Sequence, residues 1–192
     1  MPALFVEYRP EDRGGEIPPD LVIRAATEAD CATIVAIAGE RDTETDLEHA
    51  LARCNRHVAD DGVCLVVAAA GGETCGFARA AWFEPPEGAP ADGAPAGWYL
   101  FGIIVRERWR RRGIGARLTE ARLAWIAKRA DEAYYFANAQ NRASLDLHDR
   151  VGFRELTRSF SFPGASFQGG TGVLSRIDLG DHPSADDVGS RS

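Results

Sequence analysis

A turn rich in arginine and glycine contains the residues of this chain that are best suited to chemistry. Gly113 and Gly115 lack Cβ atoms, so the backbone can adopt positive φ values there and approach a ligand closely. The segment that follows has helical spacing, and the free N–H groups at a helix N-terminus attract anions. Arg110, Arg111 and Arg112 add cationic donors that suit phosphate. The turn is therefore predicted to bind a phosphate-containing ligand.

Two common phosphate-binding motifs do not match this turn. A P-loop requires a lysine directly after its second glycine, and no lysine stands near Gly113. A dinucleotide fingerprint requires Gly or Ala three residues past the second glycine, where this chain has Leu118. The turn instead fits the pattern Arg/Gln-x-x-Gly-x-Gly/Ala, directly after an apolar segment that ends at Val105. Arg106 and Arg108 lie outside this pattern and are expected to be surface charge.

A second motif lies downstream and reads Asn141-Arg-Ala-Ser144-Leu-Asp-Leu-His148-Asp-Arg-Val-Gly152-Phe153. Together the two motifs resemble those of the GCN5-related N-acetyltransferase (GNAT) superfamily, over roughly residues 21–179. The resemblance implies an enzyme that moves an acetyl group from acetyl-CoA to a primary amine of a small molecule or peptide, by direct attack in a ternary complex. No metal is expected. It also implies an α/β (α+β) fold with a mixed, mostly antiparallel central sheet flanked by helices.

The resemblance further assigns roles in acetyl-CoA binding. Ile103, Ile104 and Val105 are expected to present backbone groups to the pantetheine arm, and Asn141 and Ser144 to lie near the pantetheine or the adenosine. Asn141 is equally well explained as the N-cap of a helix that begins at Arg142. The pyrophosphate is expected to contact the turn itself, namely Arg110, Arg111, Arg112, Gly113, Ile114, Gly115 and Ala116.

Acyl transfer from a thioester needs an oxyanion donor and a proton for the leaving thiolate. A bulge near Gly102 is expected to free the N–H of Ile104 or Val105 as the donor. His148 stands where the family usually has the Tyr that protonates the thiolate, and an ordinary imidazole, with a pKa of about 6.5, would be partly protonated at neutral pH. The alternative is a partly buried histidine with no catalytic task.

The general base is the least defined of these roles, because the strand before the turn contains no acid. Glu84, at the end of the preceding strand, is the nearest candidate by topology, acting through a water chain; the alternative is an exposed loop carboxylate. Tyr99, or a water held by backbone carbonyls, is also considered. The missing strand carboxylate and the change from Tyr to His leave open a second function, a non-catalytic acyl-CoA-binding or sensor domain.

Acceptor selection is expected from three loops, at Asp42–Asp46, 85–97 and 163–172. Acids in the first loop suit a cationic amine, although acidic loops are usually only solvated. Four aromatic residues are candidates for an apolar lining, with core packing as the default: Trp82, Trp98, Phe162 and Phe167.

The elements that must position these residues follow the order β-α-α-β-β-β-α-β-α-β-β. Helices are expected after Thr27 or Asp30, from Asp46 to Val58, over 114–129 and over Arg142–Arg150. Ile114, Leu118, Ala121 and Trp125 should form the buried face of the third helix. The strands are expected at 21–26, 63–70, 75–83, 98–105, 133–138, 153–162 and 173–179. One strand-helix-strand crossover, between 98 and 138, places the ligand at the carboxyl ends of its strands.

Composition limits the remaining options. The 192 residues, 45% hydrophobic, suit one domain over 21–179, with an N-terminal extension (1–20) and a flexible C-terminal tail (180–192). The net charge of −7, from 29 acidic and 22 basic residues, argues against nucleic acid and anionic membranes as partners. No apolar stretch of about 18 residues is present, so a cytoplasmic protein is expected. Cys31, Cys54, Cys64 and Cys75 lack metal-ligand spacing, so buried reduced thiols are expected rather than a zinc site or disulfides. A homodimer is left open.

Overall fold

A mixed sheet of seven strands forms the centre of the molecule, in the order β1-β2-β3-β4-β5-β7-β6. The computed structural model describes residues 15–40 and 46–180. The strands are β1 (Val22–Ala25), β2 (Val63–Ala70), β3 (Glu73–Phe83), β4 (Gly97–Val105), β5 (Glu132–Asn138), β6 (Arg154–Thr157) and β7 (Gly172–Asp178). The α-helices are α1 (Cys31–Gly39), α2 (Leu47–Ala59), α3 (Ile114–Ile126) and α4 (Arg142–Val151). The predicted element order and fold class are confirmed.

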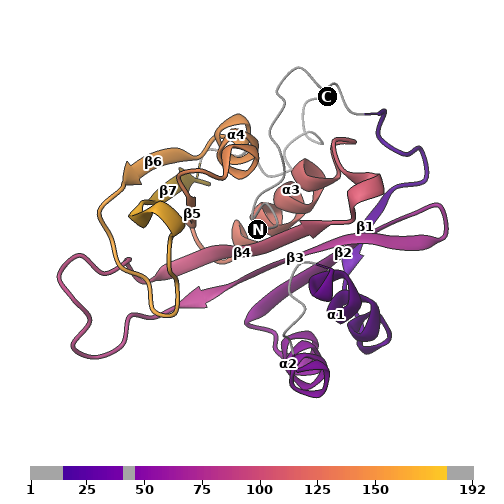
Figure 1. Cartoon of the computed structure of the whole chain (residues 1–192), viewed down its shortest axis with the longest axis horizontal. Coiled ribbons are helices and arrows are strands. Elements are labelled where there is room, and N and C mark those ends of the chain that lie inside the picture. The colour runs from indigo at the N-terminus through magenta and orange to yellow at the C-terminus, as the bar shows by residue number, and fades with distance from the viewer. Residues whose placement is uncertain (1–14, 41–45, 181–192) are drawn as a thin grey trace, which may run out of the picture.

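The helices cover the sheet from both sides. Figure 1 shows α1 and α2 on one face and α3 and α4 on the other. Within the residues that the structure describes, no helix has the length and apolar character needed to cross a membrane. Residues 1–14, 41–45 and 181–192 lie outside the described residues, and with them most of the proposed acidic acceptor loop at Asp42–Asp46 and most of the two predicted tails.

The strands β4 and β5 run parallel, whereas the other neighbouring pairs of this sheet are antiparallel. The helix α3 connects them, so the predicted crossover is confirmed. The two strands pair only at Tyr99 and Tyr134, and they diverge toward their carboxyl ends. The gap between them, called the β4–β5 gap below, therefore opens at the edge where a crossover sheet binds its ligands.

The buried face of α3 differs from the predicted one. Ile114 and Leu118 are buried as expected, but Ala121 and Trp125 are only partly buried. Four other residues of α3 complete its buried face: Thr119, Arg122, Leu123 and Ile126. The buried residues of α3 thus still recur with helical spacing, but the buried face is rotated from the predicted one because Arg122 takes a core position.

The predicted strand 153–162 is shorter in the structure, since β6 ends at Thr157. The chain then turns back over the sheet, where Phe162 packs on Phe83, Tyr99 and Phe136. Backbone hydrogen bonds join this segment to the loop after β3, from Ser161 N to Asp92 O and from Ala94 N to Ser161 O. Burial of aromatic rings therefore overrides continued strand pairing here.

A disulfide joins Cys31, at the start of α1, to Cys54 on α2. The expectation of four reduced thiols is therefore wrong for this pair, while Cys64 and Cys75 are free and buried. The spacing of these cysteines along the chain gives no sign of the bond. It forms because α1 and α2 pack together on one face of the sheet, which brings the two Cα atoms to 5.6 Å.

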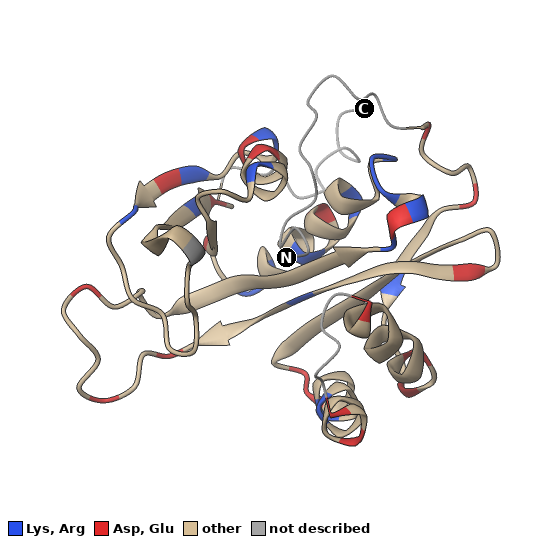
Figure 2. Ribbon diagram, viewed as in Figure 1, with Lys and Arg blue, Asp and Glu red and all other residues tan. Residues whose placement is uncertain are grey.

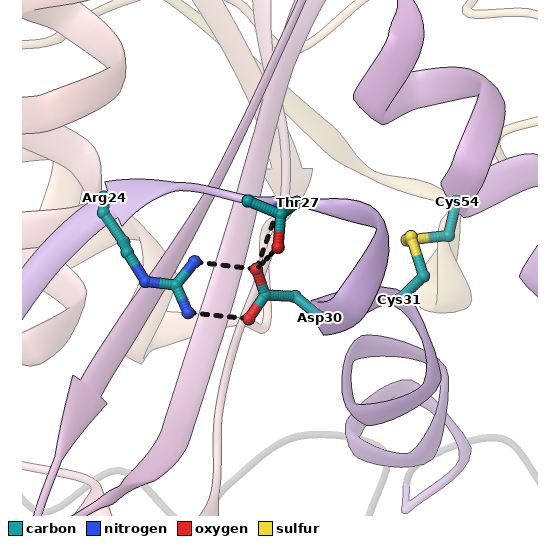
Figure 3. Close-up of a disulfide and its surroundings, with 5 residues drawn as sticks. All are labelled: Arg24, Thr27, Asp30, Cys31 and Cys54. Atoms are coloured by element: carbon teal, nitrogen blue, oxygen red, sulfur yellow. Dashed lines mark hydrogen bonds and ion pairs between the residues drawn. A yellow bond between two sulfur atoms is a disulfide. The ribbon is translucent and has the colours of Figure 1, made fainter.

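The turn into α1 is held by a cluster of polar contacts beside the disulfide (Figure 3). The Asp30 carboxylate accepts hydrogen bonds from both terminal nitrogens of Arg24, at 2.7 and 2.8 Å, and from the backbone and hydroxyl of Thr27, both at 2.8 Å. These contacts hold the pKa of Asp30 well below its usual range, Arg24 being the largest cause. The entry into α1 is thus held by these contacts just before Cys31 and by the disulfide at Cys31 itself.

Reducing the disulfide is expected to lower the free energy of unfolding by about 3 kcal/mol, because the bond closes a loop with a sequence separation of 23 in the unfolded chain. Urea unfolding of the wild type, with and without reductant, measures this change. The Cys31→Ser variant should match the reduced wild type and show no further response to reductant, whereas Cys64→Ser should respond as the wild type does. Equal stability of oxidised and reduced protein would contradict the expectation. A cytosolic glutathione pool favours the reduced form.

Candidate active site

The arginine and glycine turn follows β4 and leads directly into α3. A short 3-10 turn (Glu107–Trp109) comes first, and Gly113 then forms the N-cap of α3 with φ 74°. Arg111 also has a positive φ, of 59°, which is uncommon for a residue with a side chain. The helical hydrogen bond from Arg117 N to Gly113 O measures 3.2 Å, so the N–H groups of Ile114, Gly115 and Ala116 precede it, at the open end of the helix.

Basic residues follow one another in the segment that leads into this end of α3, drawn blue after β4 in Figure 2. Two of the predicted phosphate ligands also brace the turn. Arg110 Nε donates to the Val105 carbonyl at 2.9 Å, and the Arg112 guanidinium lies over the Trp109 ring, 5.6 Å from its centroid. The turn is therefore a braced, positively charged helix N-terminus of the kind that binds anions.

Glu73, the first residue of β3, anchors the turn. Its carboxylate accepts hydrogen bonds from Arg108, including one from Nε at 3.0 Å, and from Trp109 Nε1 at 2.7 Å. Arg106 lies 3.6 Å from the same carboxylate and 3.4 Å from Glu40. Arg106 and Arg108 therefore hold the turn in place and are not merely surface charge. No motif in the sequence identifies Glu73 as their partner.

Part of the predicted N-terminal extension belongs to this region. A Cβ built on Gly113 would lie 3.0 Å from Ile17 Cγ1, and one built on Gly15 would lie 3.1 Å from Arg112 Nη1. The Asp20 carboxylate accepts a hydrogen bond of 2.6 Å from the Gly71 backbone. Residues 15–20 therefore lie against the turn as a strap.

A bulge in β4 lies where the sequence predicts it. The register passes from Arg79 opposite Phe101 to Ala78 opposite Ile103, so Gly102, with φ 31°, is the extra residue. A bulge shifts the alternation of the backbone groups that follow it.

Beyond the bulge, the pairing decides which amides face the β4–β5 gap. Arg106 N donates to Cys75 O of β3 at 2.9 Å, so by alternation Ile104 also directs its backbone groups toward β3. The N–H groups of Ile103 and Val105 then face the gap. Val105 is therefore favoured over Ile104 as the oxyanion donor. The predicted set of gap-facing residues is corrected by removing Ile104, whose backbone groups point toward β3.

Arg122 of α3 is buried and supports the bulge from the helix side. Its Nη1 donates to the carbonyls of Arg79 and Phe101, both at 3.1 Å, and its Nη2 donates to Thr119 Oγ1 at 3.0 Å. Burial lowers the pKa of this arginine to about 9. These hydrogen bonds satisfy two carbonyls at the irregularity, which explains why a cation occupies a core position.

His148 of α4 is 2% exposed and stacks on Tyr135 of β5, with ring centroids 3.8 Å apart. Its Nδ1 lies 2.8 Å from the Ser144 carbonyl, which can only accept, so Nδ1 carries the proton. Burial lowers the pKa of His148 to about 4, so the ring is neutral at pH 7 and Nε2 has a lone pair. Nε2 is buried with no hydrogen-bond partner. The prediction that His148 is partly protonated at neutral pH is therefore wrong.

Asn141 forms the N-cap of α4, since its Oδ1 accepts a hydrogen bond of 3.2 Å from Ser144 N. The capping interpretation of Asn141 is thus confirmed. The cap also fixes Ser144, whose carbonyl orients the His148 ring. The second sequence motif therefore positions a histidine beside β5 through two successive hydrogen bonds.

Comparison with known proteins agrees with this geometry. The family model described as "Acetyltransferase (GNAT) family" matches residues 26–153, two thirds of the chain. The chain belongs to the GNAT family. It is an N-acetyltransferase by class, and the seven-stranded sheet with its β4–β5 gap is the GNAT fold of this member. No curated protein matches the chain significantly.

Solved GNAT structures superpose over most of the chain at low identity. A phosphinothricin acetyltransferase from Sinorhizobium meliloti in complex with AcCoA has a TM-score of 0.65 and 18% identity, covering 87% of this chain and 95% of that one. A putative acetyltransferase from Salmonella typhimurium with its cofactor acetyl-CoA gives 0.63 and 19%, covering 87% and 98%. A ribosomal-protein-alanine N-acetyltransferase from Brucella melitensis gives 0.63 and 25%, covering 82% and 99%.

Of the two candidate bases in this GNAT protein, Glu84 lies away from the bulge and Tyr99 lies close to it. Glu84 is exposed and accepts a hydrogen bond of 3.0 Å from Trp82 Nε1. It follows Phe83, which pairs with Gly97, and Gly97 precedes Phe101 by four residues, or about 13 Å of strand. Tyr99 is buried and donates its hydroxyl proton to Pro95 O at 2.9 Å, and burial raises its pKa. Tyr99 is therefore a protonated phenol.

The face of the sheet opposite α3 has an apolar hollow of about 200 Å³. Phe83 and Phe162 line it together with prolines of the loops at 85–97 and 161–163. Of the four aromatic candidates, only Phe162 lines this hollow. Trp82 and Trp98 instead form an edge-to-face series with Trp125 of α3, on the other face. In the described part of the chain no group of three or more His, Cys, Asp and Glu side chains could hold a metal ion.

Proposed function

We propose that this GNAT protein moves an acetyl group from acetyl-CoA to a primary amine of a small molecule or peptide, by direct attack in a ternary complex. One observation carries the proposal: β4 leads from the bulge at Gly102, past the β4–β5 gap, into the turn at Gly113 that forms the N-terminus of α3. A pantetheine arm in the gap and a pyrophosphate on the turn would use both features at once. The structures from S. typhimurium and S. meliloti, by their descriptions, contain acetyl-CoA.

The residues present fit acetyl-CoA. Ile103 and Val105 offer backbone groups to an extended amide chain, as an added strand would use them. The N–H groups from Gly113 to Ala116, with Arg111 and Arg112 beside them, suit the pyrophosphate. Asn141 and Ser144 remain proposed neighbours of the pantetheine or the adenosine, through backbone atoms rather than the capping side chain. Acetyl-CoA supplies the activated acyl group.

We further propose that the Val105 N–H stabilises the oxyanion of the tetrahedral intermediate and that His148 moves the proton. A neutral His148 accepts the proton of the attacking amine at Nε2. It then donates the same proton to the sulfur when the carbon–sulfur bond breaks. The free lone pair of Nε2 supports this order, because a ring already protonated at both nitrogens could not accept a proton from the amine.

Glu84 remains a proposed final acceptor of the proton lost by an ammonium substrate before attack. Its position about 13 Å along the strand from the bulge requires a water chain. A water held by backbone carbonyls at the bulge is the alternative base. The enzyme is proposed to work in the cytosol.

A second candidate function is an acyl-CoA sensor without turnover. Two observations favour it. The strand β4 contains no Asp or Glu, and the pKa of His148, about 4, makes its ring a weak base. The sensor would share the gap and the turn with the enzyme. Only turnover separates the two.

Titration calorimetry with acetyl-CoA, followed by thiol release over a panel of amines, tests the proposal. We expect a dissociation constant in the micromolar range, on the order of typical KM values, and thiol release that requires both the protein and an amine. Binding without thiol release for any amine would favour the sensor. No binding of acetyl-CoA would contradict both functions.

A further inference from the structure

Arg79 of β3 lies on the face of the sheet opposite α3, beside the bulge. Its guanidinium carbon sits over the Phe101 ring, 4.6 Å from the centroid. Its Nη1 lies 3.3 Å from Nε2 of His57, on α2. The side chain is therefore fixed between the sheet and α2 by an aromatic contact and a hydrogen bond.

The charge of Arg79 is not balanced by an acid in the structure. No Asp or Glu of residues 15–40 and 46–180 forms an ion pair with it. Burial lowers the pKa of His57 to about 4, so His57 is neutral and Nε2 accepts from Arg79. Burial, and next the charge of Arg53, lower the pKa of Arg79. A half-buried guanidinium held without a counterion favours binding of an anion from solution.

Arg79 is close to the reacting centre that the gap defines. It pairs with Phe101, the last β4 residue before Gly102, and Arg122 holds the carbonyls of both. Neighbouring strands lie about 4.8 Å apart, so the backbone of Arg79 is one strand spacing from β4. Phe101 and Phe136, whose ring centroids are 6.4 Å apart, come from the two strands that diverge. An anion on Arg79 would thus lie a few bonds from an amine in the gap.

We propose that Arg79 binds the carboxylate of the acceptor, so that the acceptor carries its amine and its carboxylate a few bonds apart, as an amino acid does. The inference rests on the proposed acetyl transfer and names its substrate class. A guanidinium can bind a carboxylate through two parallel hydrogen bonds, which also orients the amine. His57 acts as a positioning residue, because its lone pair holds one end of the guanidinium. Polyamines and the internal residues of a peptide lack such a carboxylate.

Matched acceptors test this inference in the full chain. Thiol release is measured with amino acids, with the corresponding amino-acid amides and with the decarboxylated amines. The wild type is expected to show a kcat/KM about 10- to 100-fold higher for the acids, as for a hydrogen-bonded charged pair. Arg79→Gln should remove this ratio with the dissociation constant of acetyl-CoA unchanged, and Arg79→Lys should restore part of it. Arg56→Gln removes an equal charge from an exposed position of α2 and should keep the ratio.

Each other outcome is decisive. Equal or better use of the amides or decarboxylated amines by the wild type overturns the inference, and leaves acetyl transfer standing. An unchanged acid-to-amide ratio in Arg79→Gln overturns the role of Arg79. The wild-type ratio decides the substrate class even where Arg79→Gln fails to fold. Absence of thiol release with every amine, while acetyl-CoA binds, overturns both the inference and the proposed transfer.

Discussion

Replacing Gly113 with valine is expected to weaken acetyl-CoA binding by at least about 100-fold, or about 3 kcal/mol. Gly113 has φ 74° at the N-cap of α3, a conformation that β-branched residues rarely adopt. A Cβ there would also lie 3.0 Å from Ile17 Cγ1. The turn must then change shape, and the N–H groups proposed to bind the pyrophosphate lose their common direction. Titration calorimetry measures the dissociation constant.

Gly88→Val is the matched control for backbone strain. Gly88 has φ 76°, and a Cβ there would meet nothing within 4 Å. Both variants should lose a similar amount of stability from the strained φ, but only Gly113→Val should lose acetyl-CoA binding. Near-normal affinity in Gly113→Val would refute the assignment of the pyrophosphate to this turn.

Replacing His148 with phenylalanine is expected to lower kcat by about 10²- to 10³-fold, within the range of general acid–base catalysis. The phenyl ring keeps the stacking on Tyr135 and the edge contact with Phe153, and removes the lone pair at Nε2. Acetyl-CoA affinity should change little, because Nε2 is not among the proposed ligands. Turnover equal to the wild type would show that His148 has no part in proton transfer.

The same variant should alter the dependence of stability on pH. The pKa of His148 is about 4 in the folded protein, against about 6.5 in the unfolded chain. The unfolded chain therefore binds the proton first, so the contribution of this group is fully present above pH 6.5 and is lost as the pH falls from about 6.5 to about 4. At pH 5 the loss is about 2 kcal/mol.

Urea unfolding at pH 7 and pH 5 measures this difference in the free energy of unfolding. His148→Phe should lose less stability between the two pH values than the wild type does. A similar contribution from His57, whose pKa is also about 4, remains in both proteins. Asp30 does not contribute in this window, because its carboxylate is ionised in both states at pH 5. An equal pH dependence of wild type and variant would contradict the neutral, buried state of His148.

The order of elements and the phosphate turn were predictable from the sequence because they depend on local physics. Hydrophobic periods of about two and 3.6 residues mark strands and helices. Positive φ at Gly113 and the bulge at Gly102 follow from the missing Cβ atom. The cap at Asn141 depends on residues three positions apart. Each feature involves neighbours along the chain, so residue type and spacing describe it.

The partners of several charged and sulfur-containing side chains could not be predicted, because they come from distant segments. Glu73 binds Arg108, which is 35 residues away, and Arg122 reaches the carbonyl of Arg79, 43 residues away. Cys31 and Cys54 meet only through the packing of α1 on α2. Burial is equally non-local, and for this reason His148, given an ordinary pKa from its residue type, is neutral in the structure.

The sequence by itself thus determined the order of the elements and the place of the arginine and glycine turn, since local backbone preferences and hydrophobic pattern decide both, and its two motifs carried the resemblance to GNAT proteins. Only the tertiary structure decided the protonation of His148, which amides face the β4–β5 gap, and that no acid of residues 15–40 and 46–180 pairs with Arg79 beside the gap. The reason is physical. Pairing register, desolvation and the meeting of side chains from β3, β4 and α2 depend on distances that exist only once the sheet and helices have packed.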